Sequence, residues 1–367
     1  MKKIKMLLAV VSLAAVLVTT PQRSVSAMGI SSQCGILLEQ VTGRVLFEKC
    51  PDEQKYIASI TKILTAIVAI ENGQLDGWVG VSDNATRQVG SSLYLALGDE
   101  MKLKDVIYGL MLRSGNDAAM IIAEAIGGDE AGFVKLMNDK AKEIGMTNSI
   151  FQNPSGLDET SYNLSTSRDM GILMRYAMNN PIFREITGTE THKATSKNGT
   201  PYVWHNKHKL VTGYYEYAIG GKTGFTKQAR RTLVTSAQKD GLELVVVTLE
   251  AGDDWNDHMS LFNYGFDQYE LKKVIEPGQL MLPDHAINEK VYVKDTVYLT
   301  VKKDGSETVS TELVLHNKVV NDEVGTLKIK LNGEEQREIT VYQTIQPKVE
   351  KISWFDKVFR WFTGTVE

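Results

Sequence analysis

The chain has 367 residues, of which 41 are basic and 45 acidic, so its formal net charge is −4 at pH 7. This slightly acidic balance excludes a nucleic-acid-binding protein that depends on a basic surface. The length exceeds what one small hydrophobic core usually holds, so we expect two domains.

Residues 1–27 have the pattern of a secretory signal peptide. Three lysines precede the apolar run MLLAVVSLAAVLVTT, and the small residues SVSA supply a cleavage point after Ala27. The run is too short and too poorly flanked for a membrane-spanning helix, although an uncleaved anchor is the alternative. Removal of this segment leaves 37 basic and 45 acidic residues, a net charge of −8. We therefore expect an exported protein.

The two cysteines, Cys34 and Cys50, bracket the segment GILLEQVTGRVLFEK, whose pattern predicts a β-hairpin. A three-residue loop, 41–43, with Gly43 in the left-handed conformation would place Cys34 opposite Cys50. In an exported protein such a pair can form a disulfide, and two reduced, buried thiols are the alternative. We expect no metal site, because no histidine lies near the cysteines in sequence and no HExxH motif occurs.

Residues 28–270 mix apolar helical segments with strands. Three segments have helical periodicity and end near glycine or asparagine, namely KILTAIVAIENG, LKDVIYGLMLRSG and DEAGFVKLMNDKAKEIG. Two later segments, RTLVTSAQ and LELVVVTLE, have the composition of strands. The second is almost wholly apolar, which predicts a central position in a sheet. Together these features predict an α/β, or α+β, domain.

The chain changes character from residue 271 onward. Residues 271–348 alternate apolar and polar side chains around Asp-Gly and Asn-Gly pairs, which predicts a small antiparallel β domain, a spacer or binding module. In residues 349–367, apolar side chains recur at helical spacing beside tryptophans and cations. We expect this amphipathic helix to lie in a membrane interface through residues 351–362. The alternative is a terminal helix packed on the β domain.

The stretch YIASITKILTAIVAI places Ser59 and Lys62 three residues apart at the start of an apolar run. Ser59 could simply cap the helix, with Lys62 reaching solvent. Because positions i and i+3 share one face of a helix, Lys62 could instead take the proton of Ser59 during a nucleophilic attack. This stretch alone leaves both interpretations open.

Two further triplets favour the catalytic interpretation. Ser114-Gly115-Asn116 lies where one helical pattern ends and the next begins, and Lys222-Thr223-Gly224 lies between a double glycine and a strand. The motifs S-x-x-K, S-x-N and K-T-G occur in this order in penicillin-recognising serine enzymes. The chain therefore resembles the low-molecular-mass penicillin-binding proteins, specifically the D-alanyl-D-alanine carboxypeptidases. The resemblance covers essentially the whole mature chain, including the segment FQNPSGLDETSYNLSTSRDM.

The resemblance implies a fold, an activity and a location. A β-lactamase/transpeptidase-like catalytic domain would be followed by the small β domain and the amphipathic tail. The enzyme would remove the terminal D-alanine from peptidoglycan stem peptides that end in D-Ala-D-Ala, without a cofactor. It would be acylated by β-lactam antibiotics and would work on the outer face of the cytoplasmic membrane.

The resemblance also implies a role for each motif residue. Ser59 would be the nucleophile and Lys62 the general base, whose pKa must then be lowered by partial burial and a nearby cation. Ser114 would relay a proton to the leaving amine, and Asn116 would hold a backbone amide of the substrate. Lys222 would supply the nearby cation and attract the terminal carboxylate of the substrate.

The strand that carries the third motif would complete the site. Thr223 would hydrogen-bond the substrate carboxylate, and Gly224 would leave room for the substrate to lie beside the strand. The backbone amides of Ser59 and Phe225 would form the oxyanion hole.

Other polar groups in the sequence receive plainer interpretations. His205 and His208 have a spacing that metal ligands can have, but without a third ligand we expect loop residues. The acidic segment AGDDWNDH is expected to be a solvated loop. The absence of a G-x-S-x-G motif gives no support for an α/β-hydrolase.

Three rival functions remain open from the sequence. A β-lactamase differs in how fast water clears the acyl-enzyme, and a D,D-endopeptidase or transpeptidase differs in the acyl acceptor and the shape of the pocket. A silent peptidoglycan-binding or β-lactam-sensing module is disfavoured, because every motif residue is present.

Overall fold

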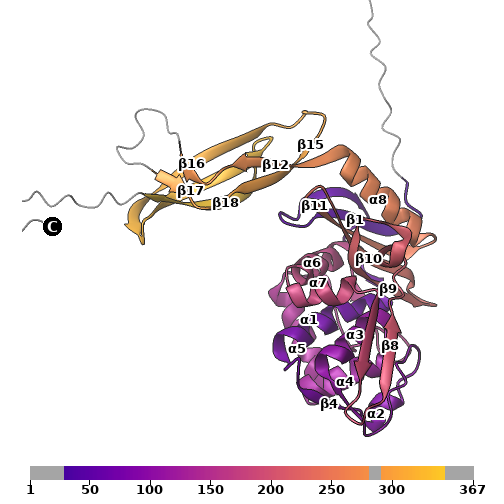
Figure 1. The fold of residues 1–367 in the computed structure, drawn as a ribbon. Coiled ribbons are helices and arrows are strands. Elements are labelled where there is room, and N and C mark those ends of the chain that lie inside the picture. Colours follow the sequence, from indigo (N-terminus) through magenta and orange to yellow (C-terminus); the bar gives the residue numbers. More distant parts are fainter. Residues whose placement is uncertain (1–28, 281–290, 344–367) are drawn as a thin grey trace, which may run out of the picture. The chain divides into compact units, whose positions relative to one another are not determined.

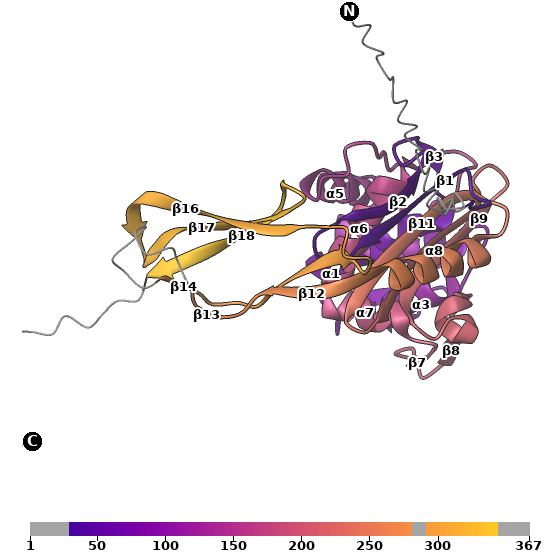
Figure 2. The ribbon, with the colours of Figure 1, turned by 90° about the horizontal axis from the view of Figure 1, so that it is seen from above.

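The computed structural model describes residues 29–280 and 291–343 (Figures 1 and 2). The expected signal peptide and the expected amphipathic tail lie outside the described residues. No helix within the described ranges is long and apolar enough to cross a membrane.

A five-stranded antiparallel sheet forms the centre of the region that carries the sequence motifs (Figure 1). Its strands, from one edge to the other, are β2 (Val45–Lys49), β1 (Cys34–Glu39), β11 (Leu242–Ala251), β10 (Arg230–Lys239) and β9 (Ala218–Thr226). The apolar segment LELVVVTLE becomes β11, the middle strand, as predicted. Gly43 adopts a φ of +77° in the β1–β2 turn, which confirms the expected left-handed position.

Two helices cover opposite faces of this sheet, α6 (Ser167–Met178) and α8 (Asp254–Gln268). A Cβ added to Gly171 of α6 would lie 2.4 Å from Leu38 Cδ1, whereas one added to Gly265 of α8 would lie 3.2 Å from Leu37 Cδ2. Leu37 and Leu38 point to opposite faces, because successive side chains alternate along a strand. The helices and the sheet therefore form a three-layer α/β arrangement, with α8 lying along one face (Figure 2).

Most of the remaining helices gather around α1 (Lys62–Asn72) on the α6 side of the sheet (Figure 1). Residues 62–70 of α1 are all buried, so this helix forms the centre of the main hydrophobic core. The helices around it are α3 (Leu103–Arg113), α4 (Asn116–Gly127), α5 (Glu130–Glu143) and α7 (Pro181–Gly188), with the short α2 (Asp83–Thr86) beside α4.

The three helices expected from periodicity are confirmed as α1, α3 and α5, with one difference at a helix end. Helix α3 ends at Arg113, and the residue that turns the chain in the left-handed conformation is Ser114, with φ +66°, instead of a glycine. A non-glycine residue in this conformation is uncommon. The strain therefore falls on a motif residue.

Short elements complete the region. They are β3 (Lys55–Tyr56), β4 (Trp78–Gly80), β5 (Glu100–Lys102), β6 (Leu164–Ser165), β7 (Thr191–Thr195), β8 (Pro201–His205), the 3₁₀-helix η1 (Ala58–Thr61) and the π-helical turn η2 (Leu210–Tyr214).

The described residues from Tyr269 onward form antiparallel strands. Strand β12 (Tyr269–Ile275) pairs with β15 (Val297–Lys302). A second sheet has the order β13 (Gly278–Gln279), β14 (Val291–Val293), β18 (Glu334–Gln343), β17 (Glu323–Leu331) and β16 (Val309–Val320). Asn332 and Gly333 both have positive φ between β17 and β18, as an Asn-Gly hairpin turn requires. The domain boundaries remain predictions.

Candidate active site

Ser59 lies in η1, in a segment whose backbone is held tightly on two sides. Ala58 has a φ of +49°, and its carbonyl oxygen lies so close to Gly156 that a Cβ there would be 1.9 Å away. On the other side, Thr232 Oγ1 of β10 donates a hydrogen bond to the carbonyl of Ile57, at 3.0 Å. The backbone that carries Ser59 is therefore fixed between the sheet and the 150–160 segment.

Lys62 is the first residue of α1, and its side chain is completely buried. Its Nζ lies 3.0 Å from Ser59 Oγ, 2.8 Å from Asn116 Oδ1 and 2.6 Å from the carbonyl oxygen of Ser155. The predicted contact across one helical turn is thus present, and solvent exposure of Lys62 is excluded. Three oxygen partners fix the direction of the amine toward Ser59.

The electrostatics around Lys62 favour a neutral amine. Burial lowers the pKa of Lys62 well below its usual value, and the Lys222 and Lys207 charges lower it further, while Asp117 opposes them. Lys222 is itself buried, and burial together with Lys207 lowers its pKa to about 7. Both motif lysines therefore lose their protons far more easily than a lysine in water, which a lysine general base requires.

The second motif forms the wall opposite Ser59 through the turn between α3 and α4. The left-handed Ser114 reverses the chain, and Asn116 begins α4 with its amide donating to the carbonyl of Ser91 at 2.7 Å. Asn116 Nδ2 donates to the carbonyl of Val89 at 2.6 Å, so its side chain bridges this loop and Lys62. Both side-chain atoms of Asn116 are thus engaged.

Asp117 holds the loop that faces this turn, and sequence reasoning did not find it. Its carboxylate accepts hydrogen bonds from the backbone amides of Leu93 and Tyr94 and from Ser92 Oγ. A buried carboxylate with several donors is a strong positional constraint. The loop residue Ser91, whose carbonyl binds Asn116, therefore has a fixed place beside the site.

The third motif occupies β9, an edge of the central sheet. A Cβ added to Gly224 would lie 2.4 Å from Thr232 Oγ1 and 3.0 Å from the backbone nitrogen of Ser59. The glycine is thus needed for the close approach of β9 to η1, a reason that differs from the expected room for substrate. The next residue, Phe225, exposes 65% of its surface and lines the pocket described below.

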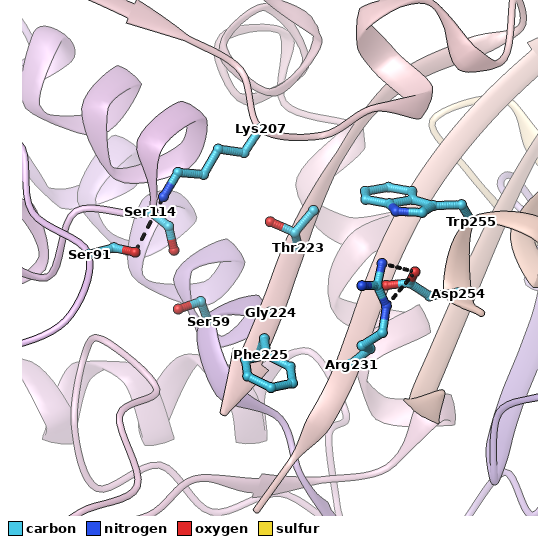
Figure 3. Close-up of a pocket in the computed structure, with 10 residues that line it drawn as sticks. All are labelled: Ser59, Ser91, Ser114, Lys207, Thr223, Gly224, Phe225, Arg231, Asp254 and Trp255. Atoms are coloured by element: carbon cyan, nitrogen blue, oxygen red, sulfur yellow. Dashed lines mark hydrogen bonds and ion pairs between the residues drawn. The ribbon is translucent and has the colours of Figure 1, made fainter. Parts of the chain in front are cut away.

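A pocket of about 350 Å³ opens over these motifs (Figure 3). Ser59, Ser114 and Thr223 line this opening, whereas the buried Lys62, Asn116 and Lys222 do not. The lining residues are Ser59, Ser91, Ser114, Lys207, Thr223, Gly224, Phe225, Arg231, Asp254 and Trp255. The structure therefore brings every predicted site residue of the three motifs into one region.

One end of the pocket is built from residues that the sequence did not point to. Arg231 of β10 donates from Nε to Asp254 Oδ1 at 2.9 Å, and its guanidinium lies 5.9 Å from the centre of the Trp255 ring (Figure 3). The prediction that the 251–258 segment is a solvated loop is wrong, because Asp254 and Asp257 are buried in α8. The ion pair with Arg231 and the hydrogen bonds that Asp257 accepts from the 31–32 backbone explain the burial.

The prediction of loop histidines is wrong for His205 but correct for His208, which lies between β8 and η2 outside any helix or strand. His205 is the last residue of β8, and His208 is completely buried, with Nε2 3.0 Å from Thr235 Oγ1 of β10. The same hydroxyl lies 2.9 Å from Nδ1 of the buried His258 on α8. The two histidines thus form a buried chain through Thr235, behind the strand that carries Lys222.

This buried chain predicts acid lability. Burial lowers the pKa of His208 to about 4, below the value of about 6.5 in an unfolded chain. As the pH falls from 6.5 to 4, the unfolded state takes up a proton that the folded state does not. The free energy of unfolding therefore falls by roughly 3 kcal/mol. The substitution His208→Asn should flatten the dependence of the unfolding free energy on pH in this window. His205→Asn is the matched control, and an unchanged slope in His208→Asn would contradict this account.

The close approach at Gly224 gives a second prediction. Gly224→Ala should push β9 away from the Ser59 amide. We expect the rate of acylation to fall by about 10²-fold, because the amides of Ser59 and Phe225, the expected oxyanion hole, would separate. Gly80→Ala is the control, since a Cβ there meets nothing within 4 Å. Stopped-flow measurement of β-lactam acylation checks this, and a parental rate in Gly224→Ala would refute the role of the close approach.

Comparison with known proteins agrees with this geometry. Residues 21–253 match the sequence model of the peptidase S11 family, D-alanyl-D-alanine carboxypeptidase. The chain belongs to this family. It is a serine-type D-Ala-D-Ala carboxypeptidase with a penicillin-binding α/β fold.

Individual relatives extend the comparison. The D-alanyl-D-alanine carboxypeptidase DacF of Bacillus subtilis is 29% identical over 84% of this chain and 84% of its own length. The crystal structure of the D-alanyl-D-alanine carboxypeptidase DacD from Francisella tularensis superposes with a TM-score of 0.66, at 26% identity, over 86% of this chain and 94% of that one. A D-alanyl-D-alanine endopeptidase of Escherichia coli is 29% identical over 75% of this chain and 87% of its own.

Proposed function

We propose that Ser59 is the nucleophile that carries the acyl-enzyme and that Lys62 is its general base. The supporting observation is the 3.0 Å separation of Lys62 Nζ from Ser59 Oγ inside a buried pocket wall. Neutral Lys62 takes the Ser59 proton as Oγ attacks the carbonyl carbon between the two D-alanines. The backbone amides of Ser59 and Phe225 receive the oxyanion of the tetrahedral intermediate.

Collapse of the intermediate breaks the peptide bond. The proton on Lys62 passes through the Ser114 hydroxyl to the amine of the leaving D-alanine, and the acyl group stays on Ser59. A water molecule then attacks the ester, with Lys62 again as base, and the shortened stem peptide leaves. Each proton that Lys62 takes is returned, so the cycle needs no cofactor.

The substrate carboxylate binds at the β9 end of the pocket. Thr223 donates a hydrogen bond to it and Lys222 attracts it from behind the strand. Lys207 adds a positive charge to the lining, where Asp254 balances the charge of Arg231. In the proposed complex, Asn116 Nδ2 exchanges its bond with the Val89 carbonyl for one with a substrate carbonyl, because its two side-chain atoms are otherwise occupied. Its Oδ1 meanwhile keeps Lys62 aimed at Ser59.

The proposed setting is the outer face of the cytoplasmic membrane. The N-terminal 27 residues support export, and the amphipathic pattern of residues 351–362 supports peripheral attachment. Peptidoglycan stem peptides are present on that side. β-Lactam antibiotics would react there with Ser59.

The fate of the acyl group separates the rival activities. We expect the full-length chain to release D-alanine from a soluble peptide that ends in D-Ala-D-Ala, and to hold a penicilloyl group on Ser59 for minutes or longer. Rapid turnover of penicillin would favour a β-lactamase. Cleavage of a cross-linked peptide dimer in preference to the linear peptide would favour an endopeptidase, the activity named for the Escherichia coli relative.

A further inference from the structure

The two cysteines lie beside the edge strand of the central sheet, and the catalytic cycle does not use them. Cys34 is the first residue of β1 and is completely buried, whereas Cys50 follows β2 directly and is exposed. The β1–β2 register pairs Gly35 with Lys49, so the next position outward places Cys34 opposite Cys50. Their sulfur atoms lie within 4.8 Å of each other.

The surroundings of the thiols decide between a metal site and a redox pair. A carboxylate oxygen of Glu53 lies 3.8 Å from Cys34 Sγ, which gives three potential ligands in one place. Lys55 Nζ, however, lies 2.8 Å from Glu53 and 3.2 Å from Glu250, so an ammonium already neutralises the carboxylate. Burial and Glu53 raise the pKa of the Cys34 thiol to about 12, which opposes the thiolate that a metal would need.

We propose that Cys34 and Cys50 form an intramolecular disulfide that fastens the edge strand β2 to the sheet. The exposed Cys50 thiolate attacks a sulfur of an external disulfide and releases one thiol. Cys34 then attacks the Cys50 sulfur of the mixed disulfide, and its proton passes through water to the sulfur that leaves, which is released as the second thiol. The two cysteines lose two electrons and two protons in total, and the external disulfide is reduced to two thiols.

The position of this link explains what it would do. Among the strands of the described residues, β2 pairs only with β1, and Cys50 has a φ of +46° where the chain leaves the sheet. Nearby, the Pro51 carbonyl accepts a hydrogen bond from the amide of Arg168, at 3.0 Å. The link would therefore close the hairpin loop and restrain the unfolded chain, as cross-links do.

Catalysis should be almost insensitive to this link. Ser59 follows Cys50 by only nine residues, but its backbone is held independently by Thr232 and by the contact of Ala58 with Gly156. We therefore expect the disulfide to raise the stability of the protein and to leave the acylation rate unchanged.

The test uses the purified full chain in buffers of reduced and oxidised glutathione. We expect oxidised glutathione to remove both free thiols without adding glutathione to the protein, with a mass loss of two hydrogens and no dimer. The thermal midpoint should rise by about 5 °C, and penicillin acylation should keep its rate. In Cys50→Ser the thermal midpoint should be the same in reduced and in oxidised glutathione, and the acylation rate should equal that of the parent.

Three results would overturn the proposal. The first is persistence of both thiols in the folded chain under oxidised glutathione, and the second is oxidation only to dimers or mixed adducts. The third concerns zinc added alone to the reduced chain. If zinc binds, protects both thiols and raises the thermal midpoint as much as oxidation is expected to, the cysteines form a metal site instead. An unchanged midpoint after intramolecular oxidation would remove the stabilising role.

Discussion

Lys62→Met is expected to lower the rate of acylation by about 10³-fold, because it removes the general base and keeps the shape of the side chain. The amine of Lys62 lies 3.0 Å from Ser59 Oγ, and no other side-chain amine of the described residues hydrogen-bonds that oxygen. Methionine fills a similar volume without a charge. The variant should therefore fold, since a buried polar amine is replaced by an apolar group of similar volume.

The measurement is the second-order rate of acylation by a fluorescent penicillin, followed beside the thermal midpoint. Lys207→Met is the matched control, because Lys207 lines the same pocket and donates to Ser91 Oγ instead of Ser59. We expect a much smaller loss of rate in the control. A folded Lys62→Met variant that acylates at the parental rate would show that another group takes the Ser59 proton.

Lys222→Gln is expected to move the acid limb of the acylation rate to higher pH. Lys222 contributes to the low pKa of Lys62, second only to burial. Without that charge the pKa of Lys62 rises, so a smaller fraction of the amine is neutral at pH 7 and more alkaline solution is needed to free it. The loss of attraction for the substrate carboxylate adds to the effect, for a combined reduction of about 10²-fold at neutral pH.

The pH dependence separates these two contributions. A lost carboxylate contact lowers the rate at every pH, whereas the electrostatic effect shifts the limb itself. Lys227→Gln removes the same charge from an exposed position just after β9 and should leave the limb in place. A parental pH profile in Lys222→Gln would mean that burial alone sets the protonation of Lys62.

The sequence predicts the site best where the chemistry depends on neighbours along the chain. The spacing of Ser59 and Lys62 places them one turn apart on a helix, and the structure has this contact. The helical periods around α1 and the apolar run of β11 likewise predict elements whose burial follows from their own residues.

The rest depends on contacts between distant segments. The third partner of Lys62 is the backbone carbonyl of Ser155. Every residue has a backbone carbonyl, so the sequence does not indicate which one binds Lys62. From its neighbours in sequence, Asp254 is expected at the surface. In the structure Arg231 of β10 pairs with it, which allows its burial. His205 and His208 lack a third ligand in sequence, and only the packing of β10 and α8 shows why His208 is buried.

Release of D-alanine tests the central claim most directly. The full-length chain and its Ser59→Ala variant would each be mixed with a peptide ending in D-Ala-D-Ala, with D-alanine measured over time. The mass of the active-site tryptic peptide would be read after penicillin treatment. We expect D-alanine and a penicilloyl group on the peptide that contains Ser59 from the parent, and neither from the folded variant. Equal release of D-alanine by both proteins, or an adduct on a different peptide, would contradict the assignment of Ser59 as the nucleophile.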